Sequence, residues 1–435
     1  MATFFVQNFG CRATQADGAA LESLLAAKGL SPERERSRAD LVVLNTCTVT
    51  AAADEDVRQT LRRVHRENPH ARILVTGCYA QRAPQELAAM PGVEWVVGNS
   101  HKTQIADLVT SAPYHGNIHV GDIFAQRDFL SAPVEDAAGE RTRPNLKIQD
   151  GCNNRCSFCI IPYVRGRSRS ASPEEVVAQV RRLAARYCEV VISGINLGRW
   201  GREPGSRMRL ADLVRLLLAG TSMERIRLSS IEPMDLSDDL LGLMAESPRI
   251  ARHVHAPLQS GSDRILRLMR RKYRPRHYAD RIFKARHLLP DAAIGADVMV
   301  GFPGESEADF AESRRFIEEL PFTYLHVFTY SERPGTPAAR MSGSVPLPVR
   351  KERNRILREV AAAKNMQFRR SMVGRTLSAV TLHEPGAALT SNYLTVRLAR
   401  PEAPNRLIDV EIGGLTETGL RQATSPAVLP LLSQS

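Results

Sequence analysis

The chain has 435 residues, 43% of them hydrophobic and 24% charged, so it can form about two to four folded domains and is not a disordered protein. Its formal net charge is +12, and a surplus of this size favours a polyanionic partner such as nucleic acid. No apolar run approaches the length of a spanning helix, which argues against a membrane partner. The first residues lack the basic region and apolar core of a signal peptide, so a cytoplasmic protein is predicted.

Residues 1–112 alternate between strand and helix patterns, which predicts an α/β domain with a parallel sheet. The expected elements are strands at 4–6, 41–44 and 72–75 and helices at 17–28 and 54–68. Asp54 is expected to cap the second helix and Pro69 to end it. Residues 113–142 lack sustained periodicity and contain several prolines and glycines, which is typical of a linker.

A second α/β run covers residues 143–370. Its expected strands lie at 145–149, 190–193, 225–229, 253–256, 294–300 and 324–329. A helix opens at Ser172, where Pro173 and Glu175 complete a capping box. Six strands with right-handed helical crossovers predict an open (β/α)6 barrel. A basic helix runs to about Arg370, and short alternating patterns within 371–432 predict a small C-terminal β-barrel or sandwich.

Three closely spaced cysteines follow the first strand of the predicted barrel, at Cys152, Cys156 and Cys159. Three thiolates on one loop can hold an iron–sulfur cluster while leaving one metal corner free for a ligand other than protein. The alternative is a zinc knuckle that borrows a histidine or Cys188 as its fourth ligand. Cys188 itself precedes a buried strand and is expected to be a small core residue.

Three widely spaced cysteines each follow a strand of the N-terminal domain, at Cys11, Cys47 and Cys78. In open parallel sheets, ligand sites form beyond the carboxyl ends of the strands, so these three side chains can converge on one edge. Taken singly, each would be an ordinary buried cysteine.

The C-x3-C-x2-C motif after the first strand of a barrel resembles the radical S-adenosylmethionine (SAM) superfamily. That resemblance implies a 4Fe-4S cluster on Cys152, Cys156 and Cys159 whose free iron chelates SAM, and which donates the electron that cleaves SAM to the 5′-deoxyadenosyl radical. The turns at 193–198, 229–233, 257–262 and 301–305, at or just beyond the ends of predicted strands, extend the likeness. Gly194 and Asn196 are implied SAM contacts, and Phe158 is a candidate to pack on the adenine or within the core.

The segments at 9–12, 44–50 and 75–79 are similar to the N-terminal domain of the methylthiotransferases, in which three cysteines hold a second 4Fe-4S cluster. The resemblance implies this role for Cys11, Cys47 and Cys78. Many members have asparagine three residues after the first cysteine, where this chain has Thr14, so a hydrogen bond near the ligand differs. The two cluster domains are expected to be joined only by the linker.

Positive charge gathers in two stretches, 263–290 and 340–375, each with ten basic and two acidic residues. Concentrated charge favours a surface that tracks phosphates, and the candidate RNA contacts are Arg270, Arg271, Lys272 and Arg274. Tyr273 and Tyr278 are candidates to stack on bases. The alternative is that both stretches are solvated helix faces.

The C-terminal segments at 373–375 and 392–396 resemble the RNA-binding TRAM domain of the same family. The sequences of residues 45–53 and 194–200 resemble those of the subgroup that adds a methylthio group to carbon 2 of N6-threonylcarbamoyladenosine at tRNA position 37. The resemblance implies tRNA, an unidentified electron donor, two clusters and SAM as partners and cofactors. Isopentenyladenosine in tRNA and a ribosomal-protein aspartate are alternative substrates. A non-catalytic iron–sulfur tRNA-binding or electron-carrier protein is the alternative of another class.

Overall fold

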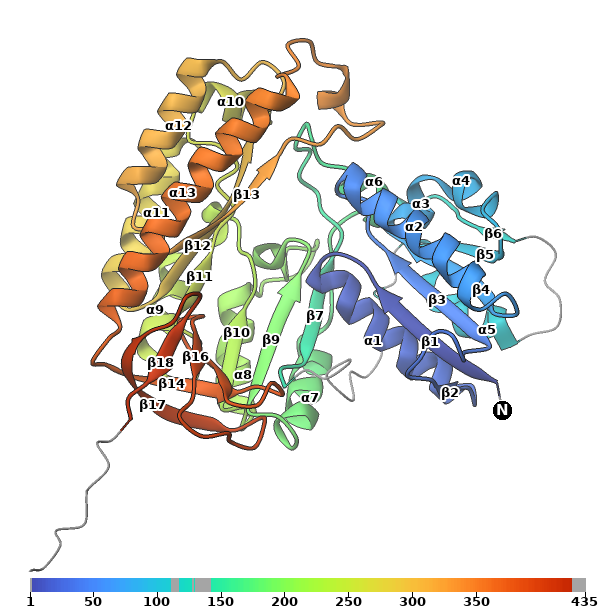
Figure 1. The fold of residues 1–435 in the computed structure, drawn as a ribbon, viewed down its shortest axis with the longest axis horizontal. Coiled ribbons are helices and arrows are strands. Elements are labelled where there is room, and N and C mark those ends of the chain that lie inside the picture. Colours follow the sequence, from blue (N-terminus) through green and yellow to red (C-terminus); the bar gives the residue numbers. More distant parts are fainter. Residues whose placement is uncertain (1, 111–116, 127–128, 130–141, 425–435) are drawn as a thin grey trace, which may run out of the picture.

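The computed structural model describes residues 2–110, 117–126, 129 and 142–424, which form three units in chain order (Figure 1). An N-terminal α/β unit and a small C-terminal β-barrel lie against a central half-barrel. Among the helices of the described residues, none is long and apolar enough to cross a membrane. The predicted α/β class and order of units are confirmed.

The N-terminal unit is a parallel sheet with helices on both faces. Its strands, in the spatial order β2-β1-β3-β4-β5-β6, are β2 (Ser31–Pro32), β1 (Thr3–Asn8), β3 (Leu41–Thr46), β4 (Arg72–Gly77), β5 (Val93–Gly98) and β6 (Ile118–His119). Its helices are α1 (Arg12–Ala27), α2 (Ala51–Glu67), α3 (Cys78–Arg82), α4 (Pro84–Ala88), η1 (Lys102–Gln104) and α5 (Ile105–Thr110). β3 and most of β4 are buried, because helices cover them from both sides.

The central unit has six parallel strands in sequential order. They are β7 (Asn145–Asp150), β9 (Glu189–Gly194), β10 (Arg225–Leu228), β11 (His253–His255), β12 (Ala293–Val300) and β13 (Tyr324–Thr329). The short β8 (Arg169–Ser170) pairs antiparallel with β7. β10 is linked to the segment just before β11 by one parallel bridge, Ile226 to Ile250. Among the described residues β13 pairs with β12 and not with β7, so the barrel is open.

Helices cover the outside of this half-barrel. They are α7 (Pro173–Ala184), α8 (Leu210–Gly220), α9 (Asp238–Glu246), α10 (Asp263–Leu268), α11 (Pro275–Leu288), α12 (Glu307–Glu319) and α13 (Leu347–Ser371), with single 3-10 turns η2 (Leu197–Arg199), η3 (Pro233–Asp235) and η4 (Pro337–Arg340). The short α6 (Ile161–Arg165) instead lies against α3 of the N-terminal unit. The capping box predicted at Ser172 is present at the start of α7. Apolar residues of alternate strand positions pack against these helices, which directs the intervening residues into the lumen.

The lumen is therefore lined by polar side chains. The inward positions include Glu189, Arg227, His253, Asp297 and Tyr324. The C-terminal unit closes the end of the lumen at which the strands begin, where Tyr393 stacks on His253 with ring centroids 4.5 Å apart.

The C-terminal unit is a closed five-stranded barrel in the order β14-β15-β16-β18-β17. Its strands are β14 (Thr376–Thr381), β15 (Ala387–Thr390), β16 (Thr395–Arg397), β17 (Leu407–Leu415) and β18 (Leu420–Gln422). The barrel alternative of the sequence prediction is correct. β15 and β18, which have four and three residues, were not predicted, because such short runs have no detectable period.

Two local predictions differ from the structure. The predicted linker contributes β6 to the N-terminal sheet, whereas positions 113–116, 127–128 and 130–141 of it lie outside the described residues. Thr50, not Asp54, caps α2: its hydroxyl accepts from the amide of Ala53 at 3.1 Å. Asp54 is instead buried in the first turn, where it pairs with Arg82.

Candidate functional site

The closely spaced cysteines lie in the loop after β7, at Cys152, Cys156 and Cys159. Gly151 opens the loop with φ of +69°, and a Cβ there would lie 2.0 Å from the carbonyl oxygen of Arg167. Ser157, within the loop, donates its amide to the Met269 carbonyl at 3.0 Å and accepts from the Ala338 amide at 2.8 Å. The loop is thus fixed from two sides by distant parts of the barrel.

The thiols of this loop are better suited to bind a metal cluster than to ionise as free thiols. Burial raises the pKa of Cys159 to about 12, and it also raises the pKa of Cys152. Such thiols stay protonated in water at neutral pH and lose their protons when metal binds. Cys152 Sγ accepts from the Asn154 amide at 3.4 Å and lies 3.6 Å from Asn196 Nδ2. Sulfur that accepts hydrogen bonds in a mostly buried loop fits an iron–sulfur cluster.

The widely spaced cysteines follow three neighbouring strands, β1, β3 and β4. Cys47 and Cys78 are each 2% exposed, and Cys11 is exposed at the start of α1. Burial, together with the neighbouring thiols of Cys78 and Cys11, raises the pKa of Cys47 to about 12. The structure therefore brings the three thiols together at the carboxyl edge of the sheet.

Two glycines make this convergence possible. Gly10 has φ of +85°, and a Cβ there would lie 2.6 Å from Cys47 Sγ. Gly77 has φ of +98°, and a Cβ there would lie 2.4 Å from the Thr46 carbonyl oxygen. The Thr14 hydroxyl lies 3.5 Å from Cys11 Sγ, so threonine keeps a hydrogen-bonding group at the position where relatives have asparagine.

A buried ionic network joins the two cysteine sites. Asp17, on α1, contacts the ammonium groups of Lys102 and Lys147 and the guanidinium of Arg165. Asp150, the last residue of β7, pairs with Arg165 at 2.9 Å and with Lys147 at 2.9 Å. Burial alone would raise the pKa of Asp17, but Lys102, Lys147 and Arg165 hold it below its usual range. The expectation that only the linker joins the two domains is wrong.

The loop after β13 adds a second connection. Arg333 donates to the Asp54 carboxylate at 2.8 Å and to the Thr48 carbonyl at 3.2 Å, one residue beyond Cys47. The amide of Ala338, further along this loop, donates to Ser157 in the cluster loop. Sequence reasoning missed both connections, because charged residues 130 to 280 positions apart give no periodic signal.

The residues predicted to contact SAM have mixed surroundings. Asn196 lines a cavity of about 620 Å³ beside the cluster loop, together with Asn154 and Lys272. A Cβ on Gly194 would lie 2.9 Å from the Gln149 side chain, so this glycine lets β9 approach β7 closely. Phe158 packs on an apolar cluster that includes Ile265, Met269, Phe302, Tyr330 and Ala338.

Arg271 is a neighbour of the cluster loop rather than a surface cation. It is 8% exposed, and its Nη1 donates to Cys156 Sγ at 3.2 Å while Nη2 pairs with Glu232. The predicted phosphate contact of Arg271 is therefore wrong. The predicted base stacking by Tyr273 and Tyr278 is also wrong, because these side chains are 1% and 0% exposed and donate to backbone carbonyls.

Much of the positive charge in the two basic stretches is already paired. The pairs are Arg264 with Asp309, Arg267 and Arg274 with Asp263, Arg281 and Lys284 with Asp238, Arg353 with Glu305, and Arg355 with Glu352 and Glu359. Arg270 and Lys272 are exposed and have no acidic partner among the described residues. These two remain candidates for contact with RNA phosphates.

Comparison with known families agrees with this architecture. A family model described as the Radical SAM superfamily matches residues 146–317, and one described as Uncharacterized protein family UPF0004 matches residues 3–98. The radical SAM methyltransferase TsrM from Kitasatospora setae superposes with a TM-score of 0.56 at 14% identity, over 78% of this chain and 77% of that chain. The fold and the cysteine loop thus define a radical-SAM protein, a class that holds a 4Fe-4S cluster and SAM.

Related proteins of named activity identify one family within the radical-SAM class. "Threonylcarbamoyladenosine tRNA methylthiotransferase MtaB" of Aquifex aeolicus is 38% identical over 93% of this chain and 99% of its own length. The protein of the same name in Bacillus subtilis is 42% identical over 81% of this chain and 79% of its own length. "tRNA-2-methylthio-N(6)-dimethylallyladenosine synthase" of Thermobifida fusca is 36% identical over 88% of this chain and 78% of its own length. The chain belongs to the radical-SAM tRNA methylthiotransferase family.

Proposed function

We propose that this protein adds a methylthio group to carbon 2 of N6-threonylcarbamoyladenosine at position 37 of tRNA. The observation that carries the proposal is the presence of two three-cysteine sites on facing domains of one chain, joined by buried ion pairs. The relatives in Aquifex aeolicus and Bacillus subtilis carry the name of this activity. The net change replaces the hydrogen on carbon 2 by a methylthio group.

Each site is assigned one part of the reaction. When bound at Cys152, Cys156 and Cys159, a 4Fe-4S cluster with SAM supplies a radical able to remove a hydrogen atom that no acid or base could remove. Around that loop, Arg271 places a positive charge beside the Cys156 sulfur, and Asn196 approaches the Cys152 sulfur. These contacts stabilise the thiolate form that a cluster requires.

We assign the second cluster, and with it the sulfur to be transferred, to Cys11, Cys47 and Cys78. The mostly buried donor set fits such a cluster, because three thiols meet at one sheet edge and one of them remains open to solvent. Cys78 packs with Ile160 and Val164, directly after the barrel loop. The side-chain amide nitrogen of Asn99, Nδ2, lies at the same boundary: it is 3.6 Å from Cys78 Sγ and donates to the Val164 carbonyl at 2.8 Å. The sulfur site thus faces the radical site.

The test is a reaction of the reconstituted protein with defined RNAs under anaerobic conditions. One anticodon stem-loop RNA carries N6-threonylcarbamoyladenosine at position 37, and a matched one carries isopentenyladenosine. Nucleoside mass spectrometry is expected to find the methylthio product on the first RNA only. Product on the second alone would assign the protein to the activity named for the relative in Thermobifida fusca. The absence of product and of 5′-deoxyadenosine with every RNA would support a non-catalytic protein.

A further inference from the structure

The closed end of the barrel lumen concentrates positive charge around one carboxylate. Glu189, on β9, is 0% exposed and accepts from Arg227 Nε at 2.7 Å. Arg225 and Arg143 also lie near this carboxylate, at 3.6 Å and 3.5 Å. The charge of Arg12, from α1, acts on Arg143 as well. Three arginines thus share one acidic group and Arg12 lies near one of them, which leaves an excess of positive charge at a mostly buried place.

Arg227 and Arg225 have hydrogen-bond partners in the C-terminal barrel, and Arg225 Nη1 has in addition the 3.6 Å ion pair with Glu189. Arg227 donates to the carbonyls of Thr390 and Ser391 in the C-terminal barrel, at 3.1 Å and 3.0 Å. Arg225 donates to the Ser378 hydroxyl at 2.6 Å. With Glu189, these contacts attach the C-terminal unit to the central barrel. They explain Arg225 and Arg227 as structural residues, and they neutralise Glu189.

The other two arginines have donors to spare. The printed contact of the Arg12 guanidinium is with the Tyr393 hydroxyl at 3.4 Å, a weak hydrogen bond. Arg143 Nη1 is buried and lies 3.5 Å from Glu189 Oε1, an ion pair that is not a hydrogen bond, and it has no hydrogen-bond partner among the residues that the structure describes. Burial lowers the pKa of Arg143, Glu189 partly offsets this, and the charges of Arg227 and Arg12 lower it again. A cation in such a position is stabilised by an anionic ligand.

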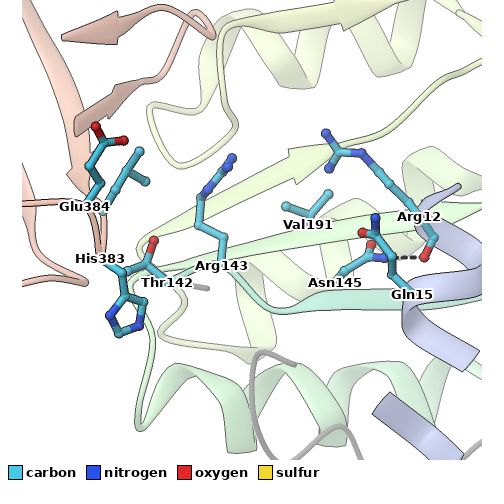
Figure 2. A pocket seen from close by; sticks show the side chains of 9 residues that line it. Arg12, Gln15, Thr142, Arg143, Asn145, Val191, His383 and Glu384 are labelled. Carbon is cyan, nitrogen blue, oxygen red and sulfur yellow. Dashed lines mark hydrogen bonds between the residues drawn. The ribbon is translucent and has the colours of Figure 1, made fainter. Parts of the chain in front are cut away.

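Both arginines line one cavity of about 420 Å³, to which all three units contribute. Figure 2 shows their side chains on either side of Val191, with the Arg12 carbonyl accepting from the Asn145 side chain at 2.6 Å. The C-terminal barrel supplies the opposite wall, including Glu384, which forms no ion pair with either arginine within the described part of the chain. The cavity therefore offers two guanidinium groups to a ligand.

We propose that Arg12 and Arg143 bind the carboxylate of the threonylcarbamoyl group of the substrate nucleoside and so distinguish it from uncharged N6 substituents. Guanidinium groups bind carboxylates with charge-assisted, often bidentate hydrogen bonds. Arg12 directly follows Cys11 in the proposed sulfur site. On adenine, only N1 separates carbon 2 from the carbon that bears N6, so the N6 substituent and the reacting carbon lie on the same edge of the ring. This inference rests on the proposed function and names the part of the substrate that selects it.

Binding of two RNAs tests the proposal. One anticodon stem-loop carries the threonyl group as the free acid and the other carries its methyl ester, which has the same shape without the charge. Affinity is measured anaerobically, at one salt concentration, with the holoprotein and its Arg12→Gln, Arg143→Gln and Arg314→Gln variants. Arg314 lies on the outer helix α12, where it pairs with Glu318, and controls for loss of one positive charge. Iron content checks that each variant holds its clusters.

The wild type and Arg314→Gln are expected to bind the acid roughly 10- to 100-fold more tightly than the ester. Arg12→Gln and Arg143→Gln are each expected to reduce that ratio several-fold, because they weaken binding of the acid RNA and not of the ester RNA. An equal loss of affinity for both RNAs would indicate that the arginines contact tRNA phosphates, and it would overturn the proposal. An unchanged ratio of the two affinities would also overturn it. Should Arg12→Gln disturb the neighbouring cluster, Arg143→Gln decides. Product formation by the wild type on the acid RNA tests the proposed function separately.

Discussion

The two cysteine sites are built in opposite ways. The barrel site takes its three cysteines from one loop of eight residues, 152–159, while the N-terminal site takes one cysteine from the end of each of three strands. The first depends on a local turn at Gly151, and the second depends on the register of a whole sheet. A local site can be recognised by its spacing, whereas a distributed site becomes visible only when the topology is known.

The surroundings of the two sites also differ. At the barrel site an arginine reaches a sulfur, Arg271 to Cys156, and Ser157 is held by distant carbonyl and amide groups. At the N-terminal site the groups that approach sulfur within hydrogen-bond range are uncharged, the Thr14 hydroxyl and the Asn99 side-chain amide, while the charges of Arg165 and Lys102 act on the thiols without a direct contact. A positive charge beside a thiolate stabilises the more negative form of a cluster's ligand set. The two sites therefore differ in the groups that contact sulfur, although each has three thiols.

The largest expected effect comes from Cys156→Ala. Losing one of three thiolates in the barrel loop removes the support for that cluster, so cleavage of SAM should fall to background. Iron content should fall by about half, because only the N-terminal cluster would remain. Anaerobic assay of 5′-deoxyadenosine with dithionite and SAM checks the prediction. Wild-type cleavage in this variant would contradict the radical-SAM role of the loop.

Cys47→Ala separates the two sites. The barrel loop is untouched, so the variant should bind SAM and release 5′-deoxyadenosine when reduced, while methylthiolated nucleoside should be absent. Iron should again fall by about half. If Cys47 were only a core residue, alanine would leave a small cavity and cost some stability but spare the product. Methylthiolated adenosine at the wild-type yield, from folded protein, would contradict the second-cluster assignment.

Asp17→Asn tests the network between the sites. The change leaves Lys102, Lys147 and Arg165 with less negative charge around them, and losing one partner of a buried ion pair costs about 3–5 kcal/mol of unfolding free energy. Methylthiolation should fall more than SAM cleavage, because the sites no longer keep their relative position. Denaturant unfolding and the ratio of the two products measure these effects.

The matched control is Asp107→Asn, which removes a carboxylate of the same domain from an exposed pair with Lys28. Its effect on stability should stay within about 0.5 kcal/mol.

The pKa of Asp17 is lowered in the folded state, so its stabilisation is full above the unfolded pKa of about 4 and is lost as the pH falls below that value. The acid-side loss of stability should therefore be smaller in Asp17→Asn than in the wild type.

The sequence predicted the elements better than their connections. All six barrel strands lie within about one or two residues of their expected positions, because buried strands are apolar runs bounded by turn residues. The two cysteine sets were likewise correct in their placement after strands. The ionic network of Asp17 was not predictable, since its partners come from three segments and none has a local pattern.

Counting charges along the sequence predicted the RNA-binding surface incorrectly for a related reason. The stretch 263–290 is strongly basic by count, but Arg271 turns inward and Arg281 and Lys284 pair with Asp238 from another helix. A linear count shows neither burial nor partners that are distant in sequence. What remains is a smaller surface, and its exposed cations with no acidic partner among the described residues are Arg270, Lys272 and Arg276.

The smallest expected effect is that of replacing Arg270 and Lys272 together with alanine. Both side chains are exposed and lie near the cluster loop, where tRNA must approach for position 37 to reach the lumen. If each contacts one phosphate, tRNA affinity should fall and the slope of log affinity against log salt should shrink by roughly 1–2 units. SAM cleavage should fall less than tRNA affinity, because neither residue contacts a cysteine in the described structure, although Lys272 lines the cavity beside the cluster loop.

The same stretch provides a control with the same change in net charge. Arg281 and Lys284 are also basic, but Asp238 already pairs with both, so their charge contributes less to the field that a phosphate meets. Their double alanine variant should leave the salt slope nearly unchanged. Equal slopes for the two double variants would mean that net charge alone attracts tRNA. A reduced slope for Arg270 and Lys272 only would locate the contact beside the barrel site, on the side from which SAM cleavage is initiated.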